Sequence, residues 1–312
     1  MSHPKIGLAL GGGGARGAAH IGVLQTLDAE KIKIDRIAGT SAGAIIGAMY
    51  AATLDTKWVE NRFRAFLESG ALESFEKRSL LADRSPDTLF SQVAKKVKDH
   101  YVIMMGLNRI SLLKKDKMAE ALSFLIPVNE FESLKIPMDI VATDLYSTES
   151  IIYSSGDLLE AIVQSSTIPG FIEPTFKEGK MLVDGGVTLP IPVPVLASKV
   201  GIKIAVDISR RDLGELKDPN MIDIMKRSET ITSLALKQKL ALEADVLIRP
   251  DVLGLHWSDF DQFDKLIDNG KKAAQEKVIE IRKLIRDQSK WSKKNSKHGF
   301  KRMRNIPFTQ KG

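Results

Sequence analysis

Two glycine-rich turns near the start of the chain each lie between a short apolar segment and a helix-like segment. Residues 5–10 lead into a glycine loop at 11–17 and then into residues 18–31, where apolar side chains recur at helical spacing. Residues 34–38 lead through the second turn into residues 42–54, which are apolar on most faces, as in a buried helix. Because each short strand runs directly into a helix, this order favours parallel strands covered by helices.

The remaining sequence continues this alternation. Further strands are expected at 138–142, 150–153, 181–183, 202–208 and 246–249, and helices at 158–165, 223–242 and 258–285. Residues 55–126 consist mainly of helix-like and loop-like segments, which we interpret as an inserted helical cap. We therefore predict an α/β fold with a central, mostly parallel sheet sandwiched by helices. A chain of 312 residues, 43% hydrophobic and 27% charged, can bury such a core.

Composition excludes some classes of site. The sequence contains no cysteine, so disulfides, thiolate metal sites and a cysteine nucleophile are ruled out. The apolar residues before the glycine loop are too few for a signal peptide. The longest mainly apolar stretch, residues 42–54, is shorter than the roughly 20 residues of a membrane-spanning helix. We expect a cytoplasmic protein, soluble or peripheral at the inner membrane face.

Positive charge is concentrated at the C-terminal end of the chain. Residues 286–312 carry nine Lys or Arg and one Asp, a net charge of +8, whereas the whole chain carries +7. We expect a basic, flexible tail here. A solvated C-terminus and contact with anionic lipid are the two main interpretations of this charge. Nucleic acid is the third interpretation and the least favoured, so no nucleic-acid partner is expected.

The second glycine turn has the pattern of a nucleophile elbow, Gly39-Thr40-Ser41-Ala42-Gly43. A serine at such a sharp strand-to-helix turn needs neighbours without side chains two positions before and after it, and Gly39 and Gly43 meet this need. The N-terminus of the following helix favours an anion that forms at the serine. The pattern predicts Ser41 as the nucleophile of an acyl-transfer enzyme. A glycine turn that only packs helix on sheet is the alternative.

The first glycine turn fits two kinds of site. Its spacing Gly12-x-Gly14-x-x-Gly17 matches a dinucleotide-binding fingerprint, which also needs an acidic residue at the end of the next strand. That strand ends in Gly39, and Asp35 lies at its start instead. Successive glycines alternatively offer unhindered backbone N–H groups to a tetrahedral oxyanion. We favour the oxyanion hole, formed by Gly11, Gly12, Gly13 and Gly14.

A serine nucleophile needs a base to accept its proton. In α/β-hydrolases the catalytic residues follow the order Ser, Asp, His, and His256 in a late loop is a candidate for the base in that order. His20 in the first helix is interpreted as structural. Asp184 fits better, because it ends an apolar strand and is followed by two glycines that leave room for close approach. Since an aspartate with a pKa of about 3.9 is a poor base, the site must desolvate Asp184 or raise its basicity in the transition state. An ordinary Asp-Gly turn is the alternative.

Three motifs in this order resemble those of the patatin-like phospholipase family: the glycine loop 11–17, the serine turn 39–43 and Asp184-Gly185-Gly186. Further similarity to the bacterial branch lies between the second and third motifs, at Ile136-Pro137, Ala142-Thr143-Asp144-Leu145, Ala161, Ser165, Pro169, Gly170, Phe171 and Pro174. The resemblance covers about residues 5–210. The chain departs from the family where many members carry Asn before a proline, because it has Val187-Thr188-Leu189-Pro190 there.

The resemblance implies a catalytic domain over residues 5–210, including the insertion at 55–126, which residues 211–285 complete with a strand and helices. It implies a Ser41–Asp184 dyad without histidine and an oxyanion hole in the glycine loop. Arg16 lies close to that loop, and His20 matches a position that the family often fills with histidine outside the dyad. The supporting motif residues are Gly17, Gly39, Gly43, Gly185 and Gly186.

The activity implied by the resemblance is that of a serine acylhydrolase, a carboxylic ester hydrolase of the phospholipase A or lysophospholipase type. It would cleave lipid esters through an acyl-enzyme and needs neither metal nor cofactor. Because the helical insertion directly follows the helix after Ser41, it would border a site for the acyl chain; ordinary surface helices are the alternative. Two alternatives remain: a catalytically silent lipid-binding or regulatory protein on the same fold, and a nucleotide-binding enzyme that uses the glycine loop.

Overall fold

The computed structural model describes residues 4–69, 111 and 113–303. These residues form an eight-stranded sheet. Seven of its strands follow one another in the order β5-β6-β3-β2-β1-β7-β8, and the eighth, β4, pairs with β3. The strands are β1 (Ile6–Leu10), β2 (Arg36–Thr40), β3 (Met138–Asp144), β4 (Ser150–Tyr153), β5 (Thr175–Lys177), β6 (Lys180–Asp184), β7 (Ile202–Val206) and β8 (Val246–Ile248). The pairings from β3 through β2, β1 and β7 to β8 are parallel, and those of β4, β5 and β6 are antiparallel. The predicted mostly parallel sheet is therefore confirmed.

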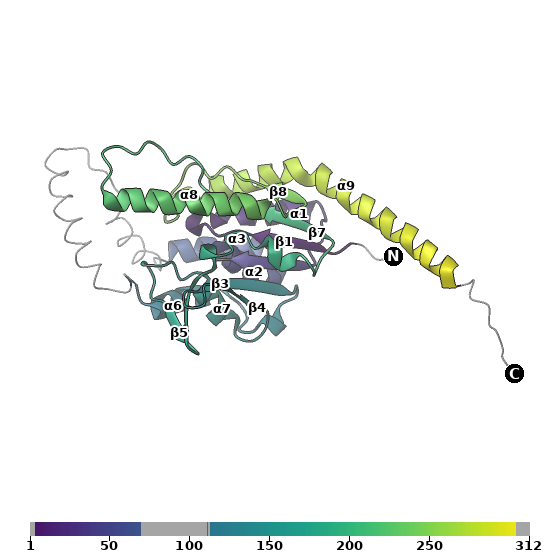
Figure 1. Ribbon diagram of the computed structural model, residues 1–312. Helices are drawn as coiled ribbons and strands as arrows, with labels where there is room; N and C mark the ends of the chain where they lie inside the picture. Colours follow the sequence, from purple (N-terminus) through teal and green to yellow (C-terminus); the bar gives the residue numbers. More distant parts are fainter. Residues whose placement is uncertain (1–3, 70–110, 112, 304–312) are drawn as a thin grey trace.

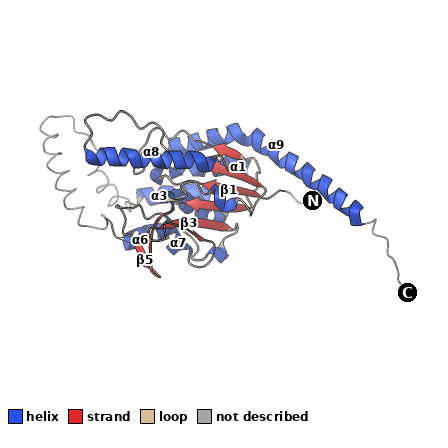
Figure 2. Cartoon of the chain, viewed as in Figure 1, coloured by secondary structure: helices blue, strands red, loops and turns tan. Residues whose placement is uncertain are grey.

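Helices cover the sheet (Figures 1 and 2). They are α1 (Ala18–Ala29), α2 (Ala42–Thr53), α3 (Thr56–Glu68), α6 (Lys115–Leu125), α7 (Leu158–Ser165), α8 (Met221–Ala241) and α9 (Phe263–Met303). Alternation along β1 separates the two faces: Ile6, Leu8 and Leu10 join the larger core with side chains of α1, α2, α7 and α9. Ala9 faces a smaller core that includes Leu240 of α8. The sheet is thus buried on both sides.

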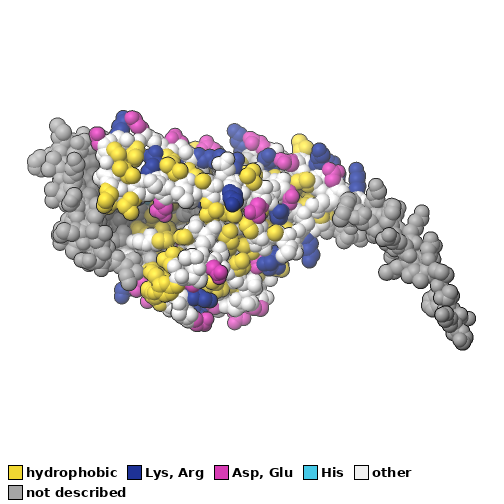
Figure 3. Space-filling model, in the orientation of Figure 1, with side chains coloured by type: hydrophobic (Ala, Val, Ile, Leu, Met, Phe, Trp, Pro, Cys, Tyr) yellow, Lys and Arg dark blue, Asp and Glu magenta, His cyan; other side chains and the backbone are white. Residues whose placement is uncertain are grey.

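Helix α8 has little of its surface in the core. Its buried residues are Leu240 and Ala241, at its C-terminal end. Apolar side chains near its start are exposed: Met221 at 72%, Ile224 at 50% and Met225 at 62%. Hydrophobic side chains are visible on the surface in this region of the molecule (Figure 3). The helix therefore meets the body of the protein mainly through its last turns.

Strand β3 brings the ends of β2 and β6 together. One edge of β3 pairs with β4 over residues 140–143. On the other edge, β2 pairs with residues 138–141 and β6 pairs with residues 142–144. A strand has only two edges, so β2 and β6 share this one. Thr40 is the partner of Val141, and Asp184 is the partner of the next residue, Ala142. The last residues of β2 and β6 consequently meet at neighbouring positions along β3.

The structure extends or corrects the expected boundaries in three places. The helical insertion is represented by α3 and α6, and its residues 70–110 and 112 lie outside the described residues. The sequence did not predict β5, a three-residue strand. Helix α9 continues to Met303 instead of ending at residue 285, so much of the expected flexible tail has helical backbone that extends away from the body (Figure 1). Residues 304–312 lie outside the described residues.

In the part of the chain that the structure describes, no helix combines the length and apolar character needed to cross a bilayer.

Candidate active site

Ser41 occupies a one-residue turn between β2 and α2. Its backbone has φ 54° and ψ −122°, which is costly for a residue other than glycine and is often found at functional sites. A Cβ on Gly39 would lie 2.7 Å from Ala44 Cα, and a Cβ on Gly43 would lie 2.1 Å from the Leu10 carbonyl oxygen. The predicted need for glycine on both sides of the serine is confirmed by these close approaches.

The backbone amide of Ser41 is held by Ser165, a residue for which the sequence analysis predicts no role. The amide donates to Ser165 Oγ at 2.9 Å, and both groups are buried. Ser165 is the last residue of α7, and 124 positions separate it from Ser41. Without this partner the turn would leave a buried N–H unpaired. Ser165 therefore supports the conformation of the elbow.

Asp184 is the hydrogen-bond partner of the Ser41 side chain. It ends β6 and is 7% exposed. Its Oδ1 accepts from the Gly186 amide at 2.7 Å, and its own amide donates to the Thr167 carbonyl at 2.8 Å. Burial raises the pKa of Asp184 to about 6, although the hydrogen bonds from Ser41 and Gly186 act in the opposite direction. The desolvation expected for a carboxylate base is thus present.

The glycine loop contributes fewer free amides than expected. The Gly11 amide donates to the Val206 carbonyl at 3.1 Å, and the Gly12 amide donates to the Pro190 carbonyl at 3.0 Å. The expectation that all four glycine amides form an oxyanion hole is corrected for these two residues. Among the described residues, the amides of Gly13 and Gly14 have no acceptor, so they remain the predicted donors.

The supporting motif residues pack around this centre. Arg16 Nε donates to the Gly13 carbonyl at 3.0 Å and so braces the loop. Burial, and then the charge of Arg210, lower the pKa of Arg16 to about 10. A Cβ on Gly17 would lie 2.8 Å from Ala42 Cβ, and one on Gly185 would lie 2.2 Å from the Val141 carbonyl. The loop, the elbow and the end of β6 are thus closely packed.

Two histidines have partners other than Ser41. His20 Nε2 donates to the Gly11 carbonyl at 2.8 Å, and burial lowers the pKa of His20 to about 4, so the ring is neutral. This contact fits the predicted structural role, because it fixes the glycine loop. His256 Nδ1 pairs with Ser258 Oγ at 2.8 Å. The carboxylate of Asp184, which hydrogen-bonds to Ser41, is therefore the better base candidate.

Lys237 is a charged neighbour of the site that sequence reasoning missed. It lies half-buried in α8, and its ammonium interacts electrostatically with Asp184, Asp207 and Arg16. Burial, and then the positive charge of Arg16, lower the pKa of Lys237 to about 8. Its charge in turn lowers the pKa of Asp184. In the sequence, Lys237 belongs to a segment whose pattern is that of a solvent-exposed helix, so nothing in that pattern predicts a role in the site.

An apolar pocket opens beside Ser41. Its empty volume, including the open mouth, is about 860 Å³. Ser41, Gly14 and Trp257 lie on its wall, and α3 and α6 contribute Phe63, Phe66, Met118, Leu122 and Leu125. The described part of the helical insertion, α3 and α6, therefore borders an apolar cavity that also reaches Ser41.

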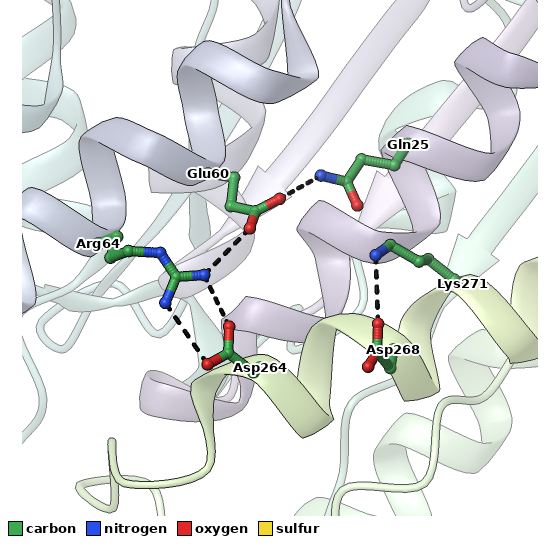
Figure 4. Close-up of polar contacts among 6 residues, drawn as sticks. All are labelled: Gln25, Glu60, Arg64, Asp264, Asp268 and Lys271. Atoms are coloured by element: carbon green, nitrogen blue, oxygen red, sulfur yellow. Dashed lines mark hydrogen bonds and ion pairs between the residues drawn. The ribbon is translucent and has the colours of Figure 1, made fainter.

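A chain of polar contacts holds α3 against α1 and α9 (Figure 4). Gln25 of α1 donates to Glu60 of α3 at 2.7 Å. Arg64 of α3 pairs with Glu60 at 3.1 Å and with Asp264 of α9 at 2.6 Å. Such partly exposed pairs are each worth about 0–1 kcal/mol, so they orient α3 more than they stabilise it.

Among the described residues, no group of three or more His, Asp or Glu side chains is placed to hold a metal ion.

Comparison with known proteins identifies relatives of the chain. A family model described as patatin-like phospholipase matches residues 8–197, a range that includes Ser41 and Asp184. An uncharacterised NTE family protein of Mycobacterium tuberculosis is 32% identical over 223 residues, which cover 70% of this chain and 54% of the relative. Lysophospholipase NTE1 of Mycosarcoma maydis is 28% identical over 298 residues, 87% of this chain and 14% of the relative. The chain thus spans about half the length, or less, of these curated relatives.

Among solved structures, VipD from Legionella pneumophila aligns with a TM-score of 0.45 and 14% identity, over 90% of this chain and 67% of that one. Human GIVD cytosolic phospholipase A2, in complex with methyl γ-linolenyl fluorophosphonate, aligns with a TM-score of 0.43 and 13% identity, over 91% and 59%.

Proposed function

The chain belongs to the patatin-like phospholipase family, and on this premise we propose that it is a serine acylhydrolase that cleaves the carboxylic esters of lipids. The observation that carries the proposal is the hydrogen bond between Ser41 and the buried Asp184 beside an apolar pocket. A relative named lysophospholipase supports the same class of substrate. A lipid-binding protein without catalysis would have no need for a strained serine paired with a desolvated carboxylate.

We propose that the reaction proceeds through an acyl-enzyme. Ser41 Oγ attacks the ester carbonyl carbon while its proton passes to Asp184. The Gly13 and Gly14 amides donate to the tetrahedral oxyanion. The bond to the alcohol oxygen then breaks, and Asp184 returns the proton to that oxygen. Water then attacks the carbonyl carbon of the acyl-enzyme while its proton passes to Asp184. The bond to Ser41 Oγ breaks and Asp184 returns the proton to that oxygen, which releases the fatty acid and regenerates Ser41.

The apolar pocket would hold the acyl chain of the substrate. Its walls from α2, α3 and α6 are mostly aliphatic and aromatic, so they stabilise hydrocarbon by burial at roughly 25 cal/mol per Å² of apolar surface. Charged groups also lie near the dyad, because the ammonium of Lys237 interacts electrostatically with Arg16, Asp207 and Asp184.

The test of this function is a hydrolysis panel. Fatty-acid release is measured from phosphatidylcholine, lysophosphatidylcholine, triacylglycerol and a short-chain ester, with the Ser41→Ala protein as the blank for each substrate. We expect release from at least one lipid ester above the blank. If the intact protein and the blank release equal amounts from every substrate, the proposed function is wrong.

The pH dependence of hydrolysis should report the base. Asp184 must be ionised to accept a proton, and its pKa is raised to about 6, so kcat/KM should rise with pH and reach half of its plateau near pH 6. An ordinary aspartate would place this midpoint near 3.9. The measurement is kcat/KM for a soluble ester between pH 4.5 and 8 in buffers of constant ionic strength. A flat profile across this range would exclude Asp184 as the base.

We also propose that the basic C-terminal residues contact anionic lipid. Residues 291–312 carry seven Lys or Arg and no acidic residue, and each cation near an anionic surface contributes about 1 kcal/mol. A chain ending at Lys290 keeps the hydrogen bond from Gln288 to the Gly201 carbonyl. Sedimentation with phosphatidylserine vesicles should be weaker for this shortened chain than for the intact one. Equal sedimentation of the two proteins would rule the contact out.

A further inference from the structure

The outward face of α8 carries a row of exposed apolar side chains that the proposed reaction does not use. The row, called here the α8 stripe, consists of Met221, Ile224, Met225, Ile231 and the C-cap residue Leu242, which are between 50% and 82% exposed. At about 100° per residue, all five lie within about 120° of the helix circumference. A surface helix normally turns its polar side to water, so an outward apolar row indicates an interaction surface.

The opposite face of α8 packs on the body of the protein. Leu240 and Ala241 are buried there in the smaller core. Lys237 precedes them by three and four positions and therefore shares their face, and its ammonium interacts electrostatically with Asp184. Since a helix is about 10–12 Å thick, a partner on the α8 stripe would lie little more than one helix away from the surroundings of the dyad.

The charges of α8 favour a partner with an anionic surface. The helix has four basic and two acidic side chains: Lys226, Arg227, Lys237, Lys239, Asp223 and Glu229. The carboxylate of Asp223 accepts from the Asn220 amide at 3.1 Å. Among residues 221–242, Lys239 is the one charged residue within the sector of the α8 stripe. Bulky apolar side chains combined with Lys and Arg are typical of helices that lie in a membrane interface.

The size of the α8 stripe fits a lipid surface better than a protein partner. A standard protein–protein interface uses about 20–30 residues on each side, whereas the stripe offers five large side chains of one helix. An interfacial helix needs only one apolar face, which sinks about 5–10 Å into the boundary between head groups and acyl chains. Its basic side chains extend their charges toward the lipid phosphates.

We propose that the α8 stripe inserts into the surface of a lipid bilayer and seats the protein on it. The inference goes beyond the proposed function, from which it takes only that the substrate is a lipid. It also differs from the contact proposed for the basic C-terminal residues. That contact is electrostatic and is screened by salt, whereas insertion of the α8 stripe depends on apolar burial.

The test measures binding in salt high enough to screen the basic residues. The protein is sedimented with vesicles of phosphatidylcholine and phosphatidylserine in 1 M NaCl, where the Debye length is about 3 Å. Ile224→Asp places a charge in the α8 stripe, and Ile279→Asp makes the same exchange at a 79% exposed isoleucine of α9. We expect the partition coefficient to fall about 10-fold, equivalent to about 1.4 kcal/mol, in Ile224→Asp alone. Equal binding of the two variants would overturn the proposal.

A fluorescent label measures insertion in a second way. The chain has no cysteine, so Met225→Cys and Ile279→Cys each provide a single site for a nitrobenzoxadiazole label. With vesicles, the emission of labelled Met225→Cys should shift to shorter wavelength as the label enters apolar surroundings, and that of labelled Ile279→Cys should not. The absence of a shift in Met225→Cys overturns the proposal even if Ile224→Asp fails to fold.

Analytical ultracentrifugation tests the other occupant of this face. If Ile224→Asp dissociates a dimer of the intact protein and leaves vesicle binding unchanged, the partner of the α8 stripe is a second copy of the chain and the proposal is wrong. All these measurements report binding rather than hydrolysis. An intact protein that binds vesicles through the α8 stripe but hydrolyses no lipid would overturn the proposed function alone.

Discussion

Replacing Ser41 by alanine is expected to reduce ester hydrolysis by roughly 10⁴-fold or more in kcat, since removal of a nucleophile leaves only the contribution of binding and oxyanion stabilisation. The same change should abolish covalent labelling by a fluorophosphonate probe. The expectation follows from the position of Ser41, the residue whose strained turn presents a hydroxyl to both Asp184 and the apolar pocket. Mass spectrometry of the labelled protein identifies the modified residue.

The labelling experiment includes its own control for folding. Thermal unfolding of Ser41→Ala and of the intact protein should be similar, because the variant keeps the backbone amide that donates to Ser165. Labelling that persists in Ser41→Ala, or that maps to another serine in the intact protein, would place the nucleophile elsewhere.

Replacing Asp184 by asparagine should likewise reduce ester turnover by several orders of magnitude. The amide can occupy the same space and accept from the Gly186 amide, but it cannot take the proton of Ser41. His256→Ala is the matched variant, because it removes the alternative base of a Ser, Asp, His triad. It should retain turnover. If His256→Ala were inactive and Asp184→Asn active, the triad would replace the dyad.

Stability should change in the opposite direction to activity in Asp184→Asn. The folded-state pKa of Asp184 is about 6, above its ordinary value of 3.8. Proton binding to Asp184 therefore stabilises the folded protein fully below pH 3.8. This contribution is lost as the pH rises through 6. At pH 8 the intact protein therefore carries a cost of about 3 kcal/mol that an uncharged asparagine avoids. Chemical denaturation should find the variant more stable at pH 8, and the gain should vanish near pH 4.

The central part of the fold could be predicted because local sequence patterns determine it. The glycine turns after β1 and β2 mark the strand-to-helix transitions, and the apolar segments that follow give α1 and α2 within two residues of their ends. The short strand β5 offered too few residues for a periodic pattern. The end of α9 was misplaced because the charge run after residue 285 was interpreted as a tail, although charged residues are compatible with a solvated helix.

The candidate site could be predicted where a motif carries its own geometry. Ser41 and Asp184 were named from their glycine neighbours, and the structure brings them together. Gly11 and Gly12 were assigned wrongly as oxyanion donors, since a glycine in the sequence does not reveal where its N–H points. The partners Ser165 and Lys237 come from helices far along the chain, and only the tertiary structure brings them to the dyad.

The junction of β2 and β6 on one edge of β3 means that Ser41, the proposed nucleophile, gains its partners late in folding. Ser41 is 124 residues from the serine that holds its amide, and its base arrives on a strand beyond that serine. Contacts of such sequence separation form slowly, because a long loop must close before they stabilise anything. A nascent or partly unfolded chain therefore contains the serine motif but no reactive serine. Reactivity of Ser41 would then indicate that the sheet is complete.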